Sequence, residues 1–314
     1  MQPLFLQPIF MDRIWGGTKL NTSFGYELPS NTTGECWGIS AHKNGDCKII
    51  NGEYEGKTLS YLWDNHRELF GNIEGDKFPL LTKILDSNDN LSVQVHPDDE
   101  YAKNNENGEL GKTECWYVID CENDSEIILG HNATSKDELE KMISNNEWDK
   151  LLRRIKIKKG DFFYVPSGAI HALCKGSLIL ETQQNSDTTY RVYDYNRTDS
   201  SGNTRELHIK KSIDVSNTPH IDINTDFKVH DTDKFKCTTF IDNEFFSVHK
   251  LNIYDKVNLN HNKPFALYSV LDGYGKLIHN DNVYNINKGN HFILPTSFGD
   301  FSFDGNLEMI CSHI

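Results

Sequence analysis

The sequence predicts an all-β-dominated protein of two β-barrel or jelly-roll units, the first of which carries a few helices. Three observations lead to this prediction. Short strand-like runs recur along the chain and are separated by Gly, Asn and Asp, a pattern typical of sandwiches and barrels. Helical periodicity is confined to a few places. Two distant segments also repeat the same pattern of Gly, Phe and Pro.

The predicted strands are rich in β-branched and aromatic residues and have the short length of β-structure. They cover residues 78–85, 91–96, 115–120, 125–130, 154–158, 161–166, 177–183, 188–195, 234–242, 245–254 and 265–273. Two segments predict helices instead. Residues 134–152 open with a Thr-Ser cap and an acidic first turn, and residues 58–70 open with Thr-Leu-Ser.

The repeat divides the chain into two similar units. Residues 158–173 overlay residues 287–303, and 117–120 overlay 269–272. Lys159 lies 39 positions after Asp120 in the first copy, whereas Lys288 lies 16 positions after Asp272 in the second. The first copy is therefore longer by about the length of the predicted helix. A polar, turn-rich boundary near residues 214–230 predicts a domain of residues 1–220 and a second of 221–314.

The composition of the chain limits the kinds of function that it can have. The chain has 314 residues, a net charge of −14 and a mean hydropathy of −0.58, and it has no apolar run near the roughly 20 residues of a membrane span. The acidic balance argues against nucleic acid as a partner. A small anionic ligand fits if Lys and Arg converge locally. The residues do not indicate an oligomeric state.

The start of the chain and its cysteines predict a cytoplasmic protein. The segment MQPLFLQPIFMDRIW lacks the basic and apolar regions of a secretory signal. The seven cysteines are odd in number and form no Cys-x-x-Cys pair, which indicates free thiols in a reducing compartment.

Four residues from separate predicted strands are candidates for a metal site. In LSVQVH, period 2 sends Ser92, Gln94 and His96 to one face. Glu114 opens the strand of residues 115–120, and His171 follows VPSGAI. Two imidazoles and a carboxylate suit Zn²⁺ or a similar divalent ion, with the Gln94 amide as a further ligand or a close neighbour. In the overlay, His171 falls on Asp300 and Glu114 on Ala266, so only the first unit retains these ligands.

The residues around His171 resemble a motif of the cupin superfamily. Gly160, five spacers, Pro166, Gly168 and His171 follow that family's second motif in spacing. Pro and Gly form a tight turn that directs the histidine into the barrel mouth. The first cupin motif is only partly present, because Gln94-Val95-His96 stands where two histidines are usual. The resemblance implies two cupin-like units.

A closer resemblance is to the short bacterial form of type I mannose-6-phosphate isomerases. Four stretches carry it: QVHPDDEYA (94–102), GKTECWYVI (111–119), VPSGAIHAL (165–173) and QQNSDTTYRVYDYNR (183–197). Residues 9–20 and 33–40 add further likeness. The resemblance implies one Zn²⁺ per chain held by Gln94, His96, Glu114 and His171. It also implies catalytic roles for Lys112 and Arg191, and a phosphorylated sugar as substrate.

Such an isomerase moves hydrogen between C1 and C2 of an open-chain sugar. The residues are compatible with proton transfer through a cis-enediol and with a metal-assisted hydride shift. Lys112 lies two residues before Glu114, so a strand directs both side chains to one face. Arg191 alternates with Tyr190 and Val192 and should point away from both; on the pocket face it would bind phosphate or stabilise the enediolate.

Two other functions remain open at this point. A cupin Fe(II) oxygenase would use two histidines and one carboxylate, and Glu100, four residues after His96, would then replace Glu114. A non-catalytic sugar-binding cupin would bind mannose 6-phosphate without turnover. Metal analysis and substitution of Glu100 or Glu114 separate these hypotheses.

Overall fold

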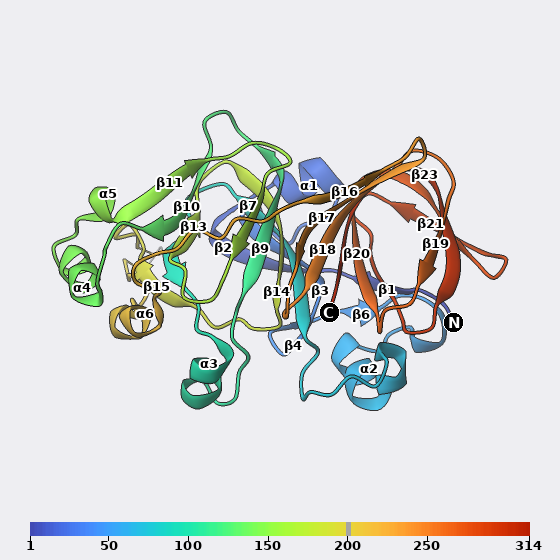
Figure 1. Cartoon of the computed structure of the whole chain (residues 1–314), viewed down its shortest axis with the longest axis horizontal. Coiled ribbons are helices and arrows are strands. Elements are labelled where there is room, and N and C mark those ends of the chain that lie inside the picture. The colour runs from blue at the N-terminus through green and yellow to red at the C-terminus, as the bar shows by residue number, and fades with distance from the viewer. Residues whose placement is uncertain (199–201) are drawn as a thin grey trace.

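The chain folds into two β-structured units that lie side by side (Figure 1). This computed structural model describes residues 1–198 and 202–314. The first unit contains two antiparallel sheets. One has six strands in the order β12 (Phe162–Val165), β9 (Glu114–Cys121), β14 (Ser177–Gln184), β7 (Leu80–Ser87), β3 (Thr33–Ile39) and β2 (Ile9–Gly17). The other has five, in the order β11 (Leu152–Lys156), β10 (Glu126–His131), β13 (His171–Leu173), β8 (Val93–Val95) and β15 (Tyr190–Tyr193).

Because successive side chains of a strand point to opposite faces, the two faces of a sheet can pack against different layers. On β9, Trp116 and Val118 lie in a core shared with the five-stranded sheet. Cys115 and Tyr117 point the other way, into a core shared with the C-terminal unit. The six-stranded sheet is therefore buried on both faces, and its inner face looks toward the five-stranded sheet.

The C-terminal unit is a ten-stranded sheet that also includes strands from the start of the chain. Its path runs β16 (Lys228–Asp231), β17 (Phe235–Asp242), β18 (Ser247–Ile253), β23 (Gly299–His313), β20 (Ala266–His279), β22 (His291–Leu294), β1 (Leu4–Gln7) and β6 (Lys48–Ile49), with β19 (Val257–His261) on β23 and β21 (Asn282–Asn287) on β20. A two-stranded pair, β4 (Ala41–His42) and β5 (Gly45–Asp46), lies apart. A division at residue 220 thus leaves β1 and β6 in the sheet of the second domain, and that division stays a prediction.

The strand register follows the sequence repeat. Glu114 on β9 pairs with Val165 on β12, and Ala266 on β20 pairs with Leu294 on β22. The overlay of the two copies aligns these same pairs. The two units therefore share a strand arrangement, although Ala266 replaces the carboxylate in the second.

The helices of the described residues all lie before residue 220, and most of them decorate the first unit as expected; the helix of residues 59–65 instead lies beside the C-terminal unit (Figure 1), where Leu62 and Trp63 pack in the core that the two units share. They are α1 (Lys19–Phe24), α2 (Leu59–Asn65), α3 (Asp99–Asn105), α4 (Lys136–Ser144), α5 (Trp148–Leu151) and α6 (Ile209–Val215), with 3₁₀ turns η1 (Gly52–Tyr54) and η2 (Arg67–Phe70). The Ser135 hydroxyl caps α4 by accepting from the Glu138 backbone N–H. Residues 134–152 were expected to form one helix. They form two, because Asn146 adopts a left-handed backbone with φ 56°.

Two histidines of the C-terminal sheet face each other at close range. The Nε2 atoms of His249 and His313 lie 3.2 Å apart, and the rings stack with centroids 5.2 Å apart. Burial, with a further contribution from His313, lowers the pKa of His249 from 6.5 to about 4. The folded protein therefore holds this imidazole neutral at a pH where the unfolded chain protonates it.

This pair predicts a loss of stability in mild acid. The unfolded chain binds more protons than the folded chain between about pH 6.5 and 4, so the free energy of unfolding falls as the pH is lowered through that window. His249→Gln removes the titrating ring, and we expect its free energy of unfolding to fall less between pH 7 and 5. Urea unfolding at both pH values measures this, with the exposed His230→Gln as control. An unchanged pH dependence in His249→Gln would exclude this contribution.

Candidate active site

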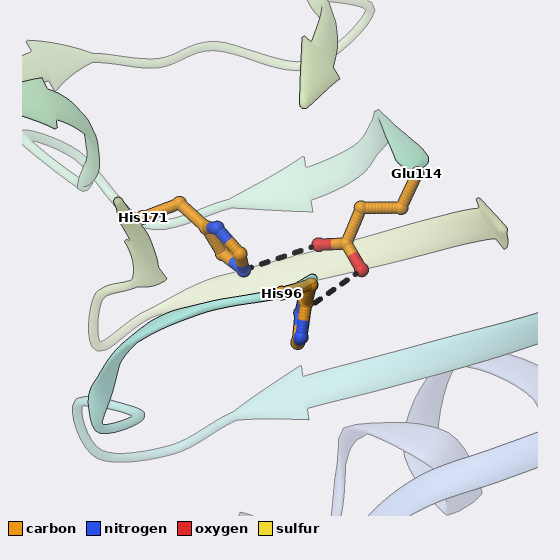
Figure 2. A group of neighbouring side chains, drawn as sticks. All are labelled: His96, Glu114 and His171. Carbon is orange, nitrogen blue, oxygen red and sulfur yellow. Dashed lines mark ion pairs between the residues drawn. The ribbon is translucent and has the colours of Figure 1, made fainter. Parts of the chain in front are cut away.

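Three buried side chains from separate segments meet between the two sheets (Figure 2). His96 follows β8, Glu114 opens β9 and His171 opens β13. The Nε2 atoms of His96 and His171 lie 3.5 Å and 3.4 Å from the two carboxylate oxygens of Glu114. One ligand atom from each residue lies within 4.8 Å of the others. The structure brings together three of the four predicted metal ligands.

Both imidazoles are held from behind by backbone oxygens. His96 Nδ1 lies 2.8 Å from the Thr188 carbonyl, and His171 Nδ1 lies 2.9 Å from the Ala169 carbonyl. Because a carbonyl only accepts, each Nδ1 carries the proton and each Nε2 presents a lone pair to the cluster. Metal-binding histidines are oriented in this way.

A glycine turn places His171. Gly168 has φ +80°, and a Cβ there would come within 2.6 Å of the Asn217 side chain. The Gly168 N–H donates to the His96 carbonyl over 2.8 Å, which ties the turn to the other histidine. Only glycine adopts this conformation without a clash, so the cupin-like motif directs His171 to the cluster.

The cluster fits a divalent cation. Glu114 is fully buried, and its Oε1 has no hydrogen-bond partner. Burial lowers the pKa of His171 to about 4 and that of His96 well below its usual range, so both rings remain neutral at physiological pH. Neutral imidazoles and a carboxylate are the form in which these groups bind metals. A buried, unpartnered carboxylate oxygen is costly without such a partner.

Gln94 lies beside the triad. It pairs in register with His171 on one side and with Arg191 on the other, and its Nε2 lies 3.3 Å from His171 Nε2. Since the orientation of a side-chain amide follows its hydrogen bonds, rotation of the Gln94 amide would turn its oxygen toward the cluster. The prediction that it is a direct ligand stays a prediction.

Lys112 contacts two residues of the triad. Its Nζ donates to Glu114 Oε2 over 2.6 Å and lies 3.0 Å from His96 Nε2. Burial opposes the charge, but the carboxylates of Glu114 and Glu181 outweigh it and raise the pKa of Lys112 above the ordinary value. The expectation that Lys112 and Glu114 share a face is confirmed, and Lys112 is an ammonium at neutral pH.

Arg191 points into the cavity next to the triad. It lines the cavity, and its Nη1 donates to the Glu206 carbonyl over 2.8 Å. Tyr190 and Val192 are buried on the opposite face, as period 2 predicts. Burial and the nearby Arg205 lower the pKa of Arg191. Its Nε is buried without a partner, while the side chain as a whole lines the cavity.

The cavity has a volume of about 410 Å³, in the range of small-ligand pockets. Five cationic side chains and three carboxylates line it, in a chain of net charge −14. They are Arg13, Lys83, Lys112, Arg191, Arg205, Glu35, Glu181 and Asp187. The cationic excess favours an anionic ligand.

Sequence reasoning missed two of these residues on predicted strands. Lys83 on β7 and Glu181 on β14 are paired in register on the inner face of the six-stranded sheet. Glu181 accepts from the Trp116 indole over 3.0 Å, and burial together with Glu114 raises its pKa. Period 2 along 78–85 and 177–183 was the available signal, since both charges interrupt apolar strands.

The alternative ligand Glu100 does not reach the cluster. It lies exposed on α3, whereas the triad is buried. The first turn of α3 places it there, because Asp98 caps this helix.

Among the described residues, no helix has the length and apolar content needed to cross a membrane.

Comparisons with known proteins identify the family of this chain. A family model described as the catalytic domain of type I phosphomannose isomerase matches residues 4–119, and one for the mannose-6-phosphate isomerase cupin domain matches residues 236–314. Mannose-6-phosphate isomerase ManA of Bacillus subtilis is 56% identical over 313 residues, covering 100% of this chain and 99% of the relative. The Streptococcus mutans mannose-6-phosphate isomerase is 52% identical over 99% of this chain and 98% of its own.

A solved structure extends the agreement to the whole fold. The crystal structure of the mannose 6-phosphate isomerase from Bacillus subtilis superposes with a TM-score of 0.98 at 53% identity, covering 100% of both chains. A structure from Archaeoglobus fulgidus, at 20% identity and a TM-score of 0.75, shares the fold. On these grounds the chain belongs to the type I phosphomannose isomerase family.

Proposed function

We propose that this protein is a zinc-dependent aldose-ketose isomerase that interconverts D-mannose 6-phosphate and D-fructose 6-phosphate. The observation that carries the proposal is the buried His96–Glu114–His171 triad, which adjoins a cationic cavity large enough for a small sugar phosphate. The names of full-length relatives at 52–56% identity support mannose 6-phosphate as a substrate.

The ligand set supports Zn²⁺ as the ion. His96, Glu114 and His171 offer two neutral nitrogens and one carboxylate, a combination common in catalytic zinc sites. Three protein ligands leave a coordination position for water or substrate, with Gln94 beside it. When bound, the ion polarises the oxygens at C1 and C2 of the sugar and stabilises negative charge on them.

Lys112 contributes positive charge and a proton donor. Its raised pKa keeps it protonated, so it assists by donating to a substrate oxygen rather than by removing a proton. Glu114 and Glu181 hold it in place: its Nζ is 2.6 Å from Glu114 and 4.0 Å from Glu181. The same contacts hold the Glu114 carboxylate toward the histidines.

Arg191 stabilises the charge that develops on the open-chain sugar. It pairs in register with Gln94, next to the triad, and its side chain lines the cavity. A guanidinium fork suits planar oxyanions such as an enediolate. A fixed donor at this position would act mainly in the transition state.

Two coarser expectations complete the proposal. We assign catalysis to residues 1–220, because the triad and all cavity-lining residues lie there. We also place the protein in the cytoplasm, where thiols remain reduced. The seven cysteines are free, five of them buried.

Removal of the metal is the direct test. We expect a chelator to abolish turnover of mannose 6-phosphate in a coupled isomerase assay, and added Zn²⁺ to restore it. Fe²⁺ under anaerobic conditions serves as the comparison. Full activity in metal-stripped protein, or restoration by Fe²⁺ alone, would contradict zinc dependence.

A matched pair of glutamates tests the ligand set. We expect Glu114→Gln to weaken zinc binding by at least about a hundredfold, since even groups behind a ligand contribute ten- to a hundredfold. Exposed Glu100→Gln should bind zinc normally. Equilibrium dialysis with elemental analysis measures both. Loss of zinc in Glu100→Gln with retention in Glu114→Gln would instead support the oxygenase arrangement.

Arg191 should act on turnover and not on the metal. We expect Arg191→Ala to retain its zinc and to lower kcat by roughly 10²- to 10³-fold, as for loss of one charge-stabilising donor. Arg154→Ala, which removes a surface ion pair with Glu126, is the control. An unchanged kcat in Arg191→Ala would remove it from the reacting centre.

A further inference from the structure

Two arginines that are far apart in the sequence line the same cavity, and each is held by a buried carboxylate. Arg13 donates from Nε and Nη2 to the two oxygens of Glu35 over 2.8 Å and 3.1 Å. Arg205 donates from Nε and Nη2 to the two oxygens of Asp194, both over 2.7 Å. Both pairs have the two-point geometry that fixes a guanidinium plane.

The carboxylate and the arginine of each ion pair differ in their exposure to solvent. The side chains of Glu35 and Asp194 are 11% and 5% exposed, whereas those of Arg13 and Arg205 are 33% and 31% exposed. Each carboxylate is thus an anchor within the protein, and each guanidinium lies at the solvent-accessible part of the cavity. The triad, by contrast, is entirely buried.

The carboxylates also have second partners that fix them. Glu35 accepts from the Trp37 indole over 2.6 Å. Asp194 accepts from Arg197 over 2.5 Å. Their cationic partners lower the pKa of both carboxyls despite burial, so both are ionised at neutral pH.

We propose that Arg13 and Arg205 bind the phosphate group of the substrate, and that Glu35 and Asp194 are positioning residues that hold these guanidinium groups toward the cavity. This inference rests on the proposed function. The phosphate is at C6, the end of the open chain remote from C1 and C2, so a sugar whose reacting carbons meet the buried triad extends its phosphate toward the more exposed arginines.

The chemistry favours these arginines over the other cations. A guanidinium has five N–H donors, of which the carboxylate takes two. Planar, fixed donors match the oxygens of a phosphate. Lys112 lies beside the triad, where it donates to Glu114, and Lys83 lies 4.4 Å over the Trp37 ring and 4.0 Å from Glu181. A dianion also loses less solvation at a partly exposed site than beside the buried triad.

Binding of inorganic phosphate to the full-length zinc protein tests the subsite. We expect Arg13→Gln and Arg205→Gln each to raise the Kd of phosphate, and the KM for mannose 6-phosphate, by roughly ten- to a hundredfold. Arg153→Gln is the matched control, because Arg153 makes a two-point ion pair with Asp222 elsewhere on the protein. Isothermal titration calorimetry gives Kd, and the coupled assay gives KM and kcat.

Asp194→Asn tests the positioning role. We expect a raised KM with kcat for mannose 6-phosphate changed less than threefold, and no further loss when it is combined with Arg205→Gln, since both act through one guanidinium. Arg205→Lys should recover only part of the affinity because it keeps the charge and loses the fork. A fall in kcat at unchanged KM would assign Asp194 a merely structural effect and overturn its positioning role.

The results separate this inference from the proposed function. Unchanged phosphate Kd in both Arg13→Gln and Arg205→Gln, with sugar turnover in the parent protein, would overturn the subsite alone. Phosphate binding that depends on both arginines, in a parent protein without turnover, would overturn the isomerase assignment and leave the subsite standing. Circular dichroism confirms that each variant is folded.

Discussion

The active site depends on three electron-pair donors held close together away from water. The Glu114 carboxylate and the Nε2 atoms of His96 and His171 would lose solvation without compensation if nothing joined them. The histidines are restrained from behind by backbone carbonyls, and the carboxylate accepts from Lys112, whose Nζ also lies 3.0 Å from His96 Nε2. This arrangement fixes the tautomers, keeps the rings neutral and leaves the lone pairs directed at one point, which a divalent cation satisfies.

The double-sided burial of the six-stranded sheet makes this arrangement rigid. Alternate residues of β9 pack against the C-terminal unit, so Cys115 and Tyr117 hold the strand whose start carries Glu114. The N-terminal strand β1 completes the sheet of the C-terminal unit through β22, which ties the two units together. The second unit retains the strand register but has Ala266 at the ligand position, and its apolar side chains pack against Cys115 and Tyr117 on one face of the first unit.

The sequence was informative where the signal was local. Period 2 predicted the face of His96 and the glycine turn the direction of His171, whereas Glu114 joined them through ligand chemistry and the family resemblance; the repeat predicted two similar units. The association of β1 with β22 was not predictable, because long-range pairing leaves no local pattern. Similarly, Arg205 comes from a connecting segment without periodicity, and its role becomes visible only through its buried partner Asp194.

Anomalous X-ray diffraction at the zinc edge, on crystals of the full-length protein grown with zinc, would locate the metal. We expect one strong anomalous peak bonded to His96 Nε2, His171 Nε2 and a Glu114 carboxylate oxygen, at the roughly 2.0–2.2 Å typical of these ligands. A peak elsewhere, or none at the triad in protein that isomerises mannose 6-phosphate, would contradict it.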